Sequence, residues 1–539
     1  MAQLEQRLFD SGLPVAALME KAALALTERL RQRLRPHAGR SGEGGERFWP
    51  AEAGVLVLVG PGHNGGDGLV VARELHLAGL PVRIWSPFER HKPLTADHLR
   101  HALWLGIPRL GEPPDPSDPA LWLDALFGIG QRRAPGEAIE RLLEERQRQR
   151  PGALVAVDGP TGLCADSGLL LGWGGATAAL TWSIGLLKRG FLQDRALARV
   201  GELERIDLGL PAVLLAELPG TTPLGLRAGD AASAPWPALD PAAAKYGRGR
   251  LLVVAGSRRY RGAAALCLAG ASASGCGSVR AALPEELAGD LWLSQPHVVL
   301  EAALPSGVGG GLDLAALELP DLTRLDALLL GPGLGPADAT GRLGEAAGAG
   351  GTGEEGVWQW LQRFAGLLLL DADGLNRLAW RGQADGAAAW LAARGGPTWI
   401  TPHRSEFDRL FPQWSALEPL EAAASAAGAS GAVVLLKGAR SVVAAPDGRL
   451  WQVSQAAPES ARAGLGDTLA GYGAGRGAMA VAAGVGQPLD AALLAAIALE
   501  HAQAGCRCLR RHGPGGVTPE AVAAALADRA PGPGAVRLS

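Results

Sequence analysis

A short apolar segment followed at once by a glycine-rich turn that carries an aspartate occurs twice in this chain of 539 residues. The first turn, residues 60–68, follows the apolar segment 55–59, and the second, residues 464–467, opens a long stretch of small residues. Glycines let a backbone approach a phosphate closely, and the amides at a helix N-terminus point toward an anion. Either turn alone could be an ordinary strand–helix connection. Together they predict two sites for phosphorylated ligands, each with a carboxylate beside the phosphate.

Strand-like and helical segments alternate in both halves of the chain. In the first half, the expected strands are 55–59, 82–85, 121–126 and 153–157, and the expected helices are 14–34, 67–78 and 136–149. In the second half, the expected strands are 250–255, 326–330, 366–370, 397–400, 432–436 and 441–444. This alternation is typical of a mostly parallel sheet covered by helices on both faces. The sequence therefore predicts an α/β fold that begins with a Rossmann-like three-layer sandwich.

A segment rich in proline, alanine and leucine, residues 211–243, lies between the two halves. It has no sustained period of 2 or 3.6 residues, as expected of a junction between domains. A chain of this length is also too long for one ordinary core. We predict two domains, residues 1–225 and residues 226–539.

The bulk composition excludes several classes of partner. A formal net charge of −3 gives no general electrostatic attraction to nucleic acids or anionic membranes, and no export signal or membrane span is visible. The five cysteines lack a CxxC pair, which argues against a disulfide framework or a zinc site. We therefore expect a cytoplasmic protein that binds small soluble ligands, with no nucleic-acid or membrane partner. We also expect a homo-oligomer.

Polar side chains follow two other apolar strands of the first half. Asp124 stands near the C-terminal end of one strand, and Asp158 and Thr161 follow the next. The carboxyl ends of strands line the ligand crevice in open α/β sheets, so these side chains and Asn64 of the first turn could face one pocket. Each acid alone could equally cap a helix. Three strand ends together favour a site.

The motifs GPGHNGGDG (60–68), DALFGIG (124–130) and VDGPTGL (157–163), followed by TWSIGLLKRG (181–190), resemble the NAD(P)H-hydrate epimerase family over residues 1–215. This resemblance implies a domain that interconverts the R and S epimers of hydrated NADH or NADPH. It also implies that Asp158 binds the substrate and acts as acid/base, and that a potassium ion is held by Asn64, Asp124 and Thr161. The implied substrate-binding residues are His63, Asn64, Gly65, Gly66, Asp67, Gly128, Ile129, Gly130, Gln131, Arg132, Arg133 and Ala134.

The second turn, GLGD (464–467), has the residues that phosphoryl transfer needs. Backbone amides would stabilise the transferring oxygens, and Asp467 would accept a proton from the attacking hydroxyl. Alone, the turn could equally be an aspartate-capped helix. Four further motifs follow expected strands: GPGLG (331–335), DADGLN (371–376), TPHRSE (401–406) and LKGARS (436–441). Asp371 and Asp373 could help to hold Mg²⁺ through water or could cap loops.

These motifs together resemble the ADP-dependent NAD(P)H-hydrate dehydratase family, which has a ribokinase-like fold, over residues 240–510. The resemblance implies that ADP, or ATP in some members, phosphorylates the C6 hydroxyl of the S hydrate with Mg²⁺ present. Loss of phosphate then restores NAD(P)H. It implies Asp467 as the base and contacts of Gly335 and His403 with the substrate. The implied nucleotide-binding residues are Lys437, Gly438, Ala439, Arg440, Ser441, Gly464 and Gly466.

The sequence therefore predicts a bifunctional repair enzyme that epimerises the hydrates and dehydrates the S epimer, giving AMP and phosphate. The alternative is a small-metabolite, vitamin-type kinase fused to a non-catalytic epimerase-like binding domain. A stable phosphorylated product would favour the kinase.

Overall fold

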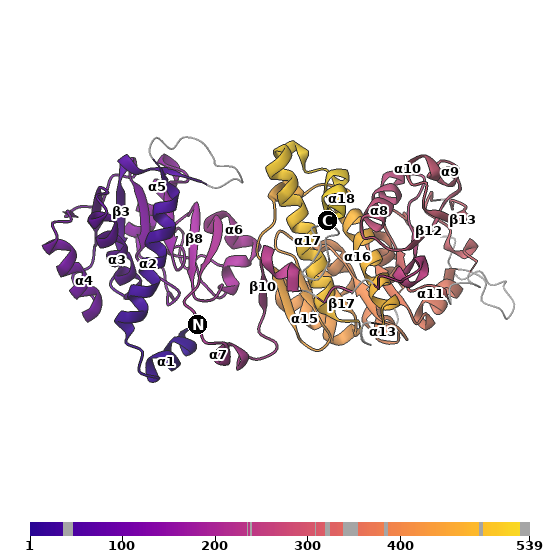
Figure 1. Cartoon of the computed structure of the whole chain (residues 1–539), viewed down its shortest axis with the longest axis horizontal. Helices are drawn as coiled ribbons and strands as arrows, with labels where there is room; N and C mark the ends of the chain where they lie inside the picture. The colour runs from indigo at the N-terminus through magenta and orange to yellow at the C-terminus, as the bar shows by residue number, and fades with distance from the viewer. Residues whose placement is uncertain are drawn as a thin grey trace. The chain divides into compact units, whose positions relative to one another are not determined.

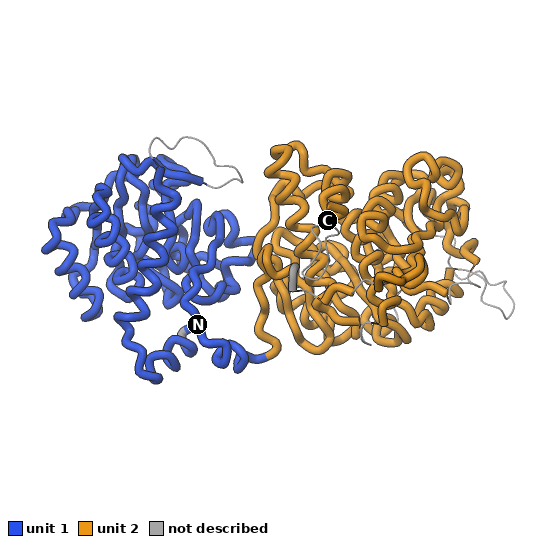
Figure 2. Tube along the Cα trace, viewed as in Figure 1, with its two compact units in different colours: residues 1–219 blue, residues 220–539 orange. Residues whose placement is uncertain are grey.

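The computed structural model describes residues 1–35, 47–233, 235–237, 240–307, 309–318, 324–337, 354–381, 386–484 and 489–528. The chain divides into two compact units, Met1–Pro219 and Gly220–Ser539 (Figure 2). Within the described ranges, no helix combines the length and the apolar character that crossing a bilayer requires.

In the described part of the first unit, seven strands form one parallel sheet in the order β5-β4-β3-β6-β7-β8-β9 (Figure 1). The strands are β3 Val55–Val59, β4 Val82–Trp85, β5 Arg109–Leu110, β6 Leu121–Ala125, β7 Leu154–Val157, β8 Leu180–Ile184 and β9 Glu202–Ile206. A separate short pair is formed by β1 Leu34–Arg35 and β2 Trp49–Pro50. The helices are α1 Ala2–Asp10, α2 Val15–Arg33, α3 His63–Leu77, α4 Pro93–Trp104, α5 Glu137–Gln149, α6 Asp194–Val200 and α7 Ala212–Ala216.

Alternate residues of β3 enter two different cores. Val55, Val57 and Val59 pack with α2, α3 and α4, whereas Leu56 and Leu58 pack with α5 on the other face. Helices thus cover both faces of the sheet, which explains why every residue of β3 is buried. The predicted α/β three-layer sandwich is confirmed.

Helix α3 begins at His63, four residues before the predicted start. The sequence GGDG is unfavourable for a helix interior, so propensity alone misplaces this end. Close packing explains the glycines, because a methyl group on Gly65 would lie 2.1 Å from the Gly60 carbonyl oxygen, and one on Gly66 would lie 2.7 Å from Met19 Cε. The glycine-rich turn is therefore mostly the first turn of α3.

The second unit contains a sheet whose described strands follow the order β10-β19-β18-β17-β16-β15-β14-β11-β12-β13. The strands are β10 Leu224–Leu226, β11 Arg250–Val254, β12 Ser278–Pro284, β13 Val299–Leu304, β14 Ala327–Leu330, β15 Leu367–Leu370, β16 Thr398–Ile400, β17 Val433–Leu436, β18 Val442–Ala444 and β19 Leu450–Val453. Pairing is parallel except on the two sides of β18. β10 lies in the predicted junction and pairs with β19, which draws these residues into the second unit.

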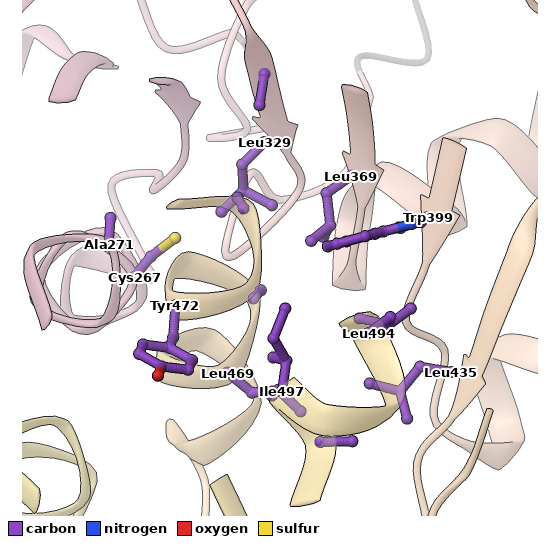
Figure 3. Close-up of a cluster of buried hydrophobic side chains, with 14 of the residues drawn as sticks. Cys267, Ala271, Leu329, Leu369, Trp399, Leu435, Leu469, Tyr472, Leu494 and Ile497 are labelled. Carbon is purple, nitrogen blue, oxygen red and sulfur yellow. The ribbon is translucent and has the colours of Figure 1, made fainter. Parts of the chain in front are cut away.

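Helices again cover both faces of this sheet. They are α8 Arg261–Ala273, α9 Glu285–Ala288, α10 Leu291–Ser294, α11 Glu354–Arg363, α12 Ala372–Arg381, α13 Gly386–Ala392, α14 Arg404–Leu410, α15 Pro419–Ser430, α16 Leu465–Ala482, α17 Ala491–His512 and α18 Pro519–Ala527. One core contains α8, α16, α17 and α18, and the other contains α11 to α15. Figure 3 shows side chains of four adjacent strands, including Leu369 and Trp399, facing Leu469 of α16 and Ile497 of α17.

Glycines let α8 and α16 approach backbone to backbone. A methyl group on Gly270 of α8 would lie 2.1 Å from the Thr468 carbonyl oxygen, and one on Gly471 of α16 would lie 1.9 Å from the Cys267 carbonyl oxygen. This contact fixes α16, whose N-terminus carries Gly464 and Asp467. The small-residue composition of α16 is therefore a packing requirement.

Gly471→Ala should destabilise the protein by about 1–3 kcal/mol, because the added methyl group forces the two helices apart. Gly428→Ala is the matched control, since Gly428 lies in α15 with open space around it. It should stabilise the protein by about 0.5–1 kcal/mol. Urea unfolding of both variants measures the difference, and equal stabilities would contradict the described packing.

Candidate active sites

A cavity of about 1110 Å³ lies in the first unit at the carboxyl ends of β3, β6 and β7. Most of the residues predicted to bind the substrate line it, together with apolar side chains of α1 and α2. The predicted residues in the lining are His63, Asn64, Asp67, Gly128, Ile129, Gly130, Gln131, Arg132, Arg133, Ala134 and Asp158. Gly65 and Gly66 are buried in the packing of α3, outside this lining.

Asp158 projects into this cavity from a strained backbone position. Its φ of 60° lies in the left-handed region, which costs a residue other than glycine roughly 1–3 kcal/mol. Lys188 Nζ donates a hydrogen bond of 2.6 Å to Asp158 Oδ1, and the Ile184 amide donates to the same oxygen at 3.2 Å. The side chain of Lys188 is buried, so the two charges depend on each other. This arrangement fixes the Asp158 carboxylate against the cavity wall.

Two further carboxyl groups line the cavity near Asp158. Burial raises the pKa of Asp67 well above its usual range, and the negative charges of Asp158 and Glu5 raise it further. Burial, followed by the charge of Asp158, also raises the pKa of Glu5 in α1. The lysine-paired carboxylate of Asp158 therefore shares the cavity with two carboxyl groups whose pKa values are raised. Groups that differ in this way can act as base and acid.

Asp124 and Thr161 are fully buried, outside the lining of this cavity. The amide and the hydroxyl of Thr161 each donate a hydrogen bond of 2.8 Å to Asp124. Burial raises the pKa of Asp124 to about 6, although both hydrogen bonds oppose this shift. Asn64 Oδ1 and Nδ2 are buried without a hydrogen-bond partner among the described residues. A buried, unpaired amide oxygen together with a buried carboxylate and a hydroxyl is a set of oxygen donors that fits a hard cation.

The predicted motifs of the second unit meet at one edge of its sheet. β14, β15, β16 and β17 are parallel neighbours, so the segments that follow them lie side by side. Lys437 Nζ, after β17, donates a hydrogen bond of 2.6 Å to Asp371 Oδ1, after β15. A methyl group on Gly466 would lie 3.5 Å from Lys437 Nζ. Lys437 is therefore adjacent to the turn that carries Asp467.

Asp467 is partly buried in the first turn of α16. Burial raises its pKa to about 7, with a further increase from the charge of Asp371 and a decrease from Lys437. Burial lowers the pKa of Lys437, but Asp371 and Glu406 outweigh it, so the net shift is upward. A carboxylate with a pKa near neutrality suits a general base at physiological pH.

The other predicted residues of this site lie in well-defined turns. His403 caps α14, where its amide donates a hydrogen bond of 2.8 Å to Glu406, and its side chain is about half exposed. Gly464, with φ of 92°, precedes α16 and leaves the first amides of that helix without helical partners. Gly438, Ala439, Arg440 and Ser441 form the connection between β17 and β18.

Gly335 is buried, and both of its backbone groups are occupied. Its amide donates to Asp373 Oδ2 at 2.8 Å, and its carbonyl oxygen accepts from Arg377 Nε at 3.2 Å. Asp373 also accepts a hydrogen bond of 3.1 Å from Asn376 Nδ2. These contacts match the loop-capping alternative given above for Asp373. Within the described ranges, no group of three or more His, Cys, Asp or Glu side chains is arranged to hold a metal ion.

Comparison with known proteins covers both units. The family described as NAD(P)H-hydrate dehydratase matches residues 251–527, and the family described as YjeF-related protein N-terminus matches residues 15–190. The bifunctional NAD(P)H-hydrate repair enzyme of Gloeobacter violaceus is 41% identical over 474 residues, which are 87% of this chain and 86% of the relative. The Synechocystis sp. enzyme of the same name is 38% identical over 473 residues, 87% and 83% of the two chains.

The chain belongs to the family of bifunctional NAD(P)H-hydrate repair enzymes. Family membership supports the repair interpretation over a vitamin-type kinase. Among solved structures, an ADP/ATP-dependent NAD(P)H-hydrate dehydratase from Bacillus subtilis, co-crystallised with ATP and Mg²⁺, is 22% identical with a TM-score of 0.43. The similarity covers 57% of this chain and 96% of that chain.

Several residues that shape the two sites of this repair enzyme were not predicted from its sequence. Lys188 stands in the quoted motif TWSIGLLKRG, but nothing in the motif indicates its pairing with Asp158. Glu5 and Arg377 lie in ordinary helical segments that carry no functional signal. Only the fold brings these side chains to the strand ends.

Lys188→Met should destabilise the repair enzyme by about 2–4 kcal/mol, because it leaves the partly buried Asp158 carboxylate without its cation. Arg132→Met is the control, because the Arg132–Asp166 ion pair has a similar N–O distance, 2.9 Å, but both of its side chains are mostly exposed. Its loss should change stability by less than about 1 kcal/mol. Chemical denaturation measures both, and a Lys188→Met protein as stable as the control would contradict the buried pair.

Proposed function

We propose that the first unit epimerises hydrated NADH or NADPH at C6 and that the second unit dehydrates the S epimer with ADP. We assign residues 1–225 to the first activity and residues 226–539 to the second. The observation that carries this proposal is the pairing of a strand-end aspartate with a lysine 2.6 Å away at the predicted site of each unit. Epimerisation supplies the dehydratase with the form that it uses.

In the first unit, Asp158 is the acid/base and the cavity binds the nucleotide. Inverting C6 requires a bond from C6 to its oxygen or to the ring nitrogen to break and to re-form on the other face. The departing atom must gain a proton, and that proton must be removed again when the bond re-forms. Asp158, held by Lys188, can accept a proton, while the raised pKa of Asp67 suits this neighbouring group to donating one.

In the second unit, Asp467 accepts the proton of the C6 hydroxyl as that oxygen attacks the terminal phosphoryl group of ADP. Lys437 and the amides at Gly464 and Gly466 stabilise the charge that develops on the phosphoryl oxygens. As the new P–O bond forms, the bond between the terminal phosphorus and the bridging oxygen of ADP breaks and AMP leaves. The C6–O bond then breaks, phosphate leaves with the bonding pair, and loss of a proton from C5 gives the dihydronicotinamide. Mg²⁺ bound with the nucleotide would neutralise phosphate charge.

The two activities can be separated with the full-length protein, ADP, Mg²⁺, K⁺ and a mixture of both epimers. The parent should restore NADH completely, measured by absorbance. Asp467→Asn should slow the recovery by about 100-fold or more, because it removes a general base. Asp158→Asn should consume the S epimer at the parent rate and the rest only at the spontaneous epimerisation rate. Repair of both epimers at the parent rate would exclude Asp158 as the catalytic residue.

We also propose that Asn64, Asp124 and Thr161 hold a potassium ion. The unpaired amide of Asn64 and the buried Asp124 carboxylate support this assignment. An ion at this place would tie the start of α3 to the end of β6 and to the segment that follows β7.

Potassium should stabilise the folded parent by about 1.4 kcal/mol at a concentration ten times its dissociation constant. Thermal unfolding in KCl and in choline chloride of equal ionic strength measures this effect. Asn64→Leu should remove the difference between the two salts. Persistence of the difference in this variant would place the ion elsewhere. The homo-oligomeric state and the cytoplasmic location remain predictions from the sequence.

A further inference from the structure

Asp371 occupies a backbone position that its neighbours hold rigidly. It follows β15 directly and is 1% exposed. The next residue, Ala372, has φ of 46°, in the left-handed region. A methyl group on Gly331, at the end of β14, would lie 1.7 Å from the Asp371 carbonyl oxygen. Strained positions of this kind persist only where the surroundings enforce them, and they are common at functional sites.

The carboxylate of Asp371 joins the ends of three adjacent strands. Its Oδ1 atom accepts a hydrogen bond of 2.6 Å from Lys437, after β17, and one of 2.8 Å from Thr401, after β16. Through this hydrogen bond, the closely packed Asp371 holds the Lys437 ammonium group beside Gly466. Lys437 is therefore already placed before any phosphate arrives.

Charged groups from several elements act on Asp467. Asp371, Asp373 of α12 and Glu406 of α14 contribute negative charge, and Lys437 contributes positive charge. Burial, followed by the charges of Asp467 and Asp371, raises the pKa of the Cys267 thiol in α8. Among the side chains, Asp371 has the largest effect on the pKa of Asp467, second only to burial.

We propose that Asp371 is a positioning residue of the dehydratase step, which holds Lys437 beside the phosphoryl-binding turn and places a fixed negative charge near Asp467. It does so without touching the reacting atoms. This inference rests on the proposed function of the second unit. Asp371, the buried first residue of the DADGLN motif, thereby has the task of orienting Lys437.

The test is the pH dependence of S-epimer dehydration by the full-length protein. Asp467 must be deprotonated to act, so the parent rate should fall as the pH drops through about 7. Asp371→Asn keeps the shape but removes the charge, which should move this acidic limb down by about one pH unit. It should also raise the KM for ADP several-fold, because Lys437 loses its anchor. Thr401→Val is the control, since it removes a hydrogen bond of Asp371 but no charge, and its limb should stay at the parent pH.

An acidic limb of Asp371→Asn at the parent pH would overturn the inference while the proposed function stands, provided that phosphate and NADH still form. If Asp371→Asn does not fold, Asp371→Glu replaces it, because the charge remains while the longer side chain moves the Lys437 ammonium group. That variant should keep the parent limb and raise the KM for ADP, and an unchanged KM would also overturn the inference. A parent protein that releases no NADH would instead refute the proposed function.

Discussion

Each unit places an aspartate at the carboxyl end of a parallel strand, with a lysine ammonium group 2.6 Å away. Asp371 is buried, and Asp158 is partly buried in the cavity wall. A carboxylate in such a place is costly unless a cation and hydrogen bonds compensate it. The pairs Asp158–Lys188 and Asp371–Lys437 provide this compensation. Asp158 itself has a left-handed backbone conformation, and Asp371 is followed by a left-handed residue, Ala372. The position of the remaining polar groups in each site depends on these pairs.

The charges of these pairs also divide the acids of each site into two kinds. In the first unit, the paired aspartate faces Asp67 and Glu5, whose pKa values are raised. In the second unit, the paired aspartate adjoins Asp467, whose pKa is raised to about 7. Neighbouring acids in different environments can take different tasks in one site. The paired acid is the catalytic candidate in the first unit and the positioning residue in the second.

Much of the framework could be predicted from the sequence because buried parallel strands are continuous apolar segments. β3, β4 and β14 to β17 lie where they were expected. The start of α3 was misplaced because packing, not helix propensity, selects glycine there, and β10 was missed because Leu224–Leu226 stands in a proline-rich segment. Strand-end acids were visible in motifs. Their lysine partners also stand in quoted motifs, but the pairings, across 30 and 66 residues, could not be predicted, because no local spacing records them.

In the proposed reaction, the C6 oxygen is phosphorylated and then leaves as phosphate, so that one ADP is consumed for each dihydronicotinamide restored. The most direct measurement is the ratio of AMP, inorganic phosphate and NADH formed from the hydrate mixture and ADP by the full-length protein. The account predicts equal amounts of all three, and no NADH when ADP is omitted. AMP accompanied by a stable phosphorylated product and no NADH would contradict it.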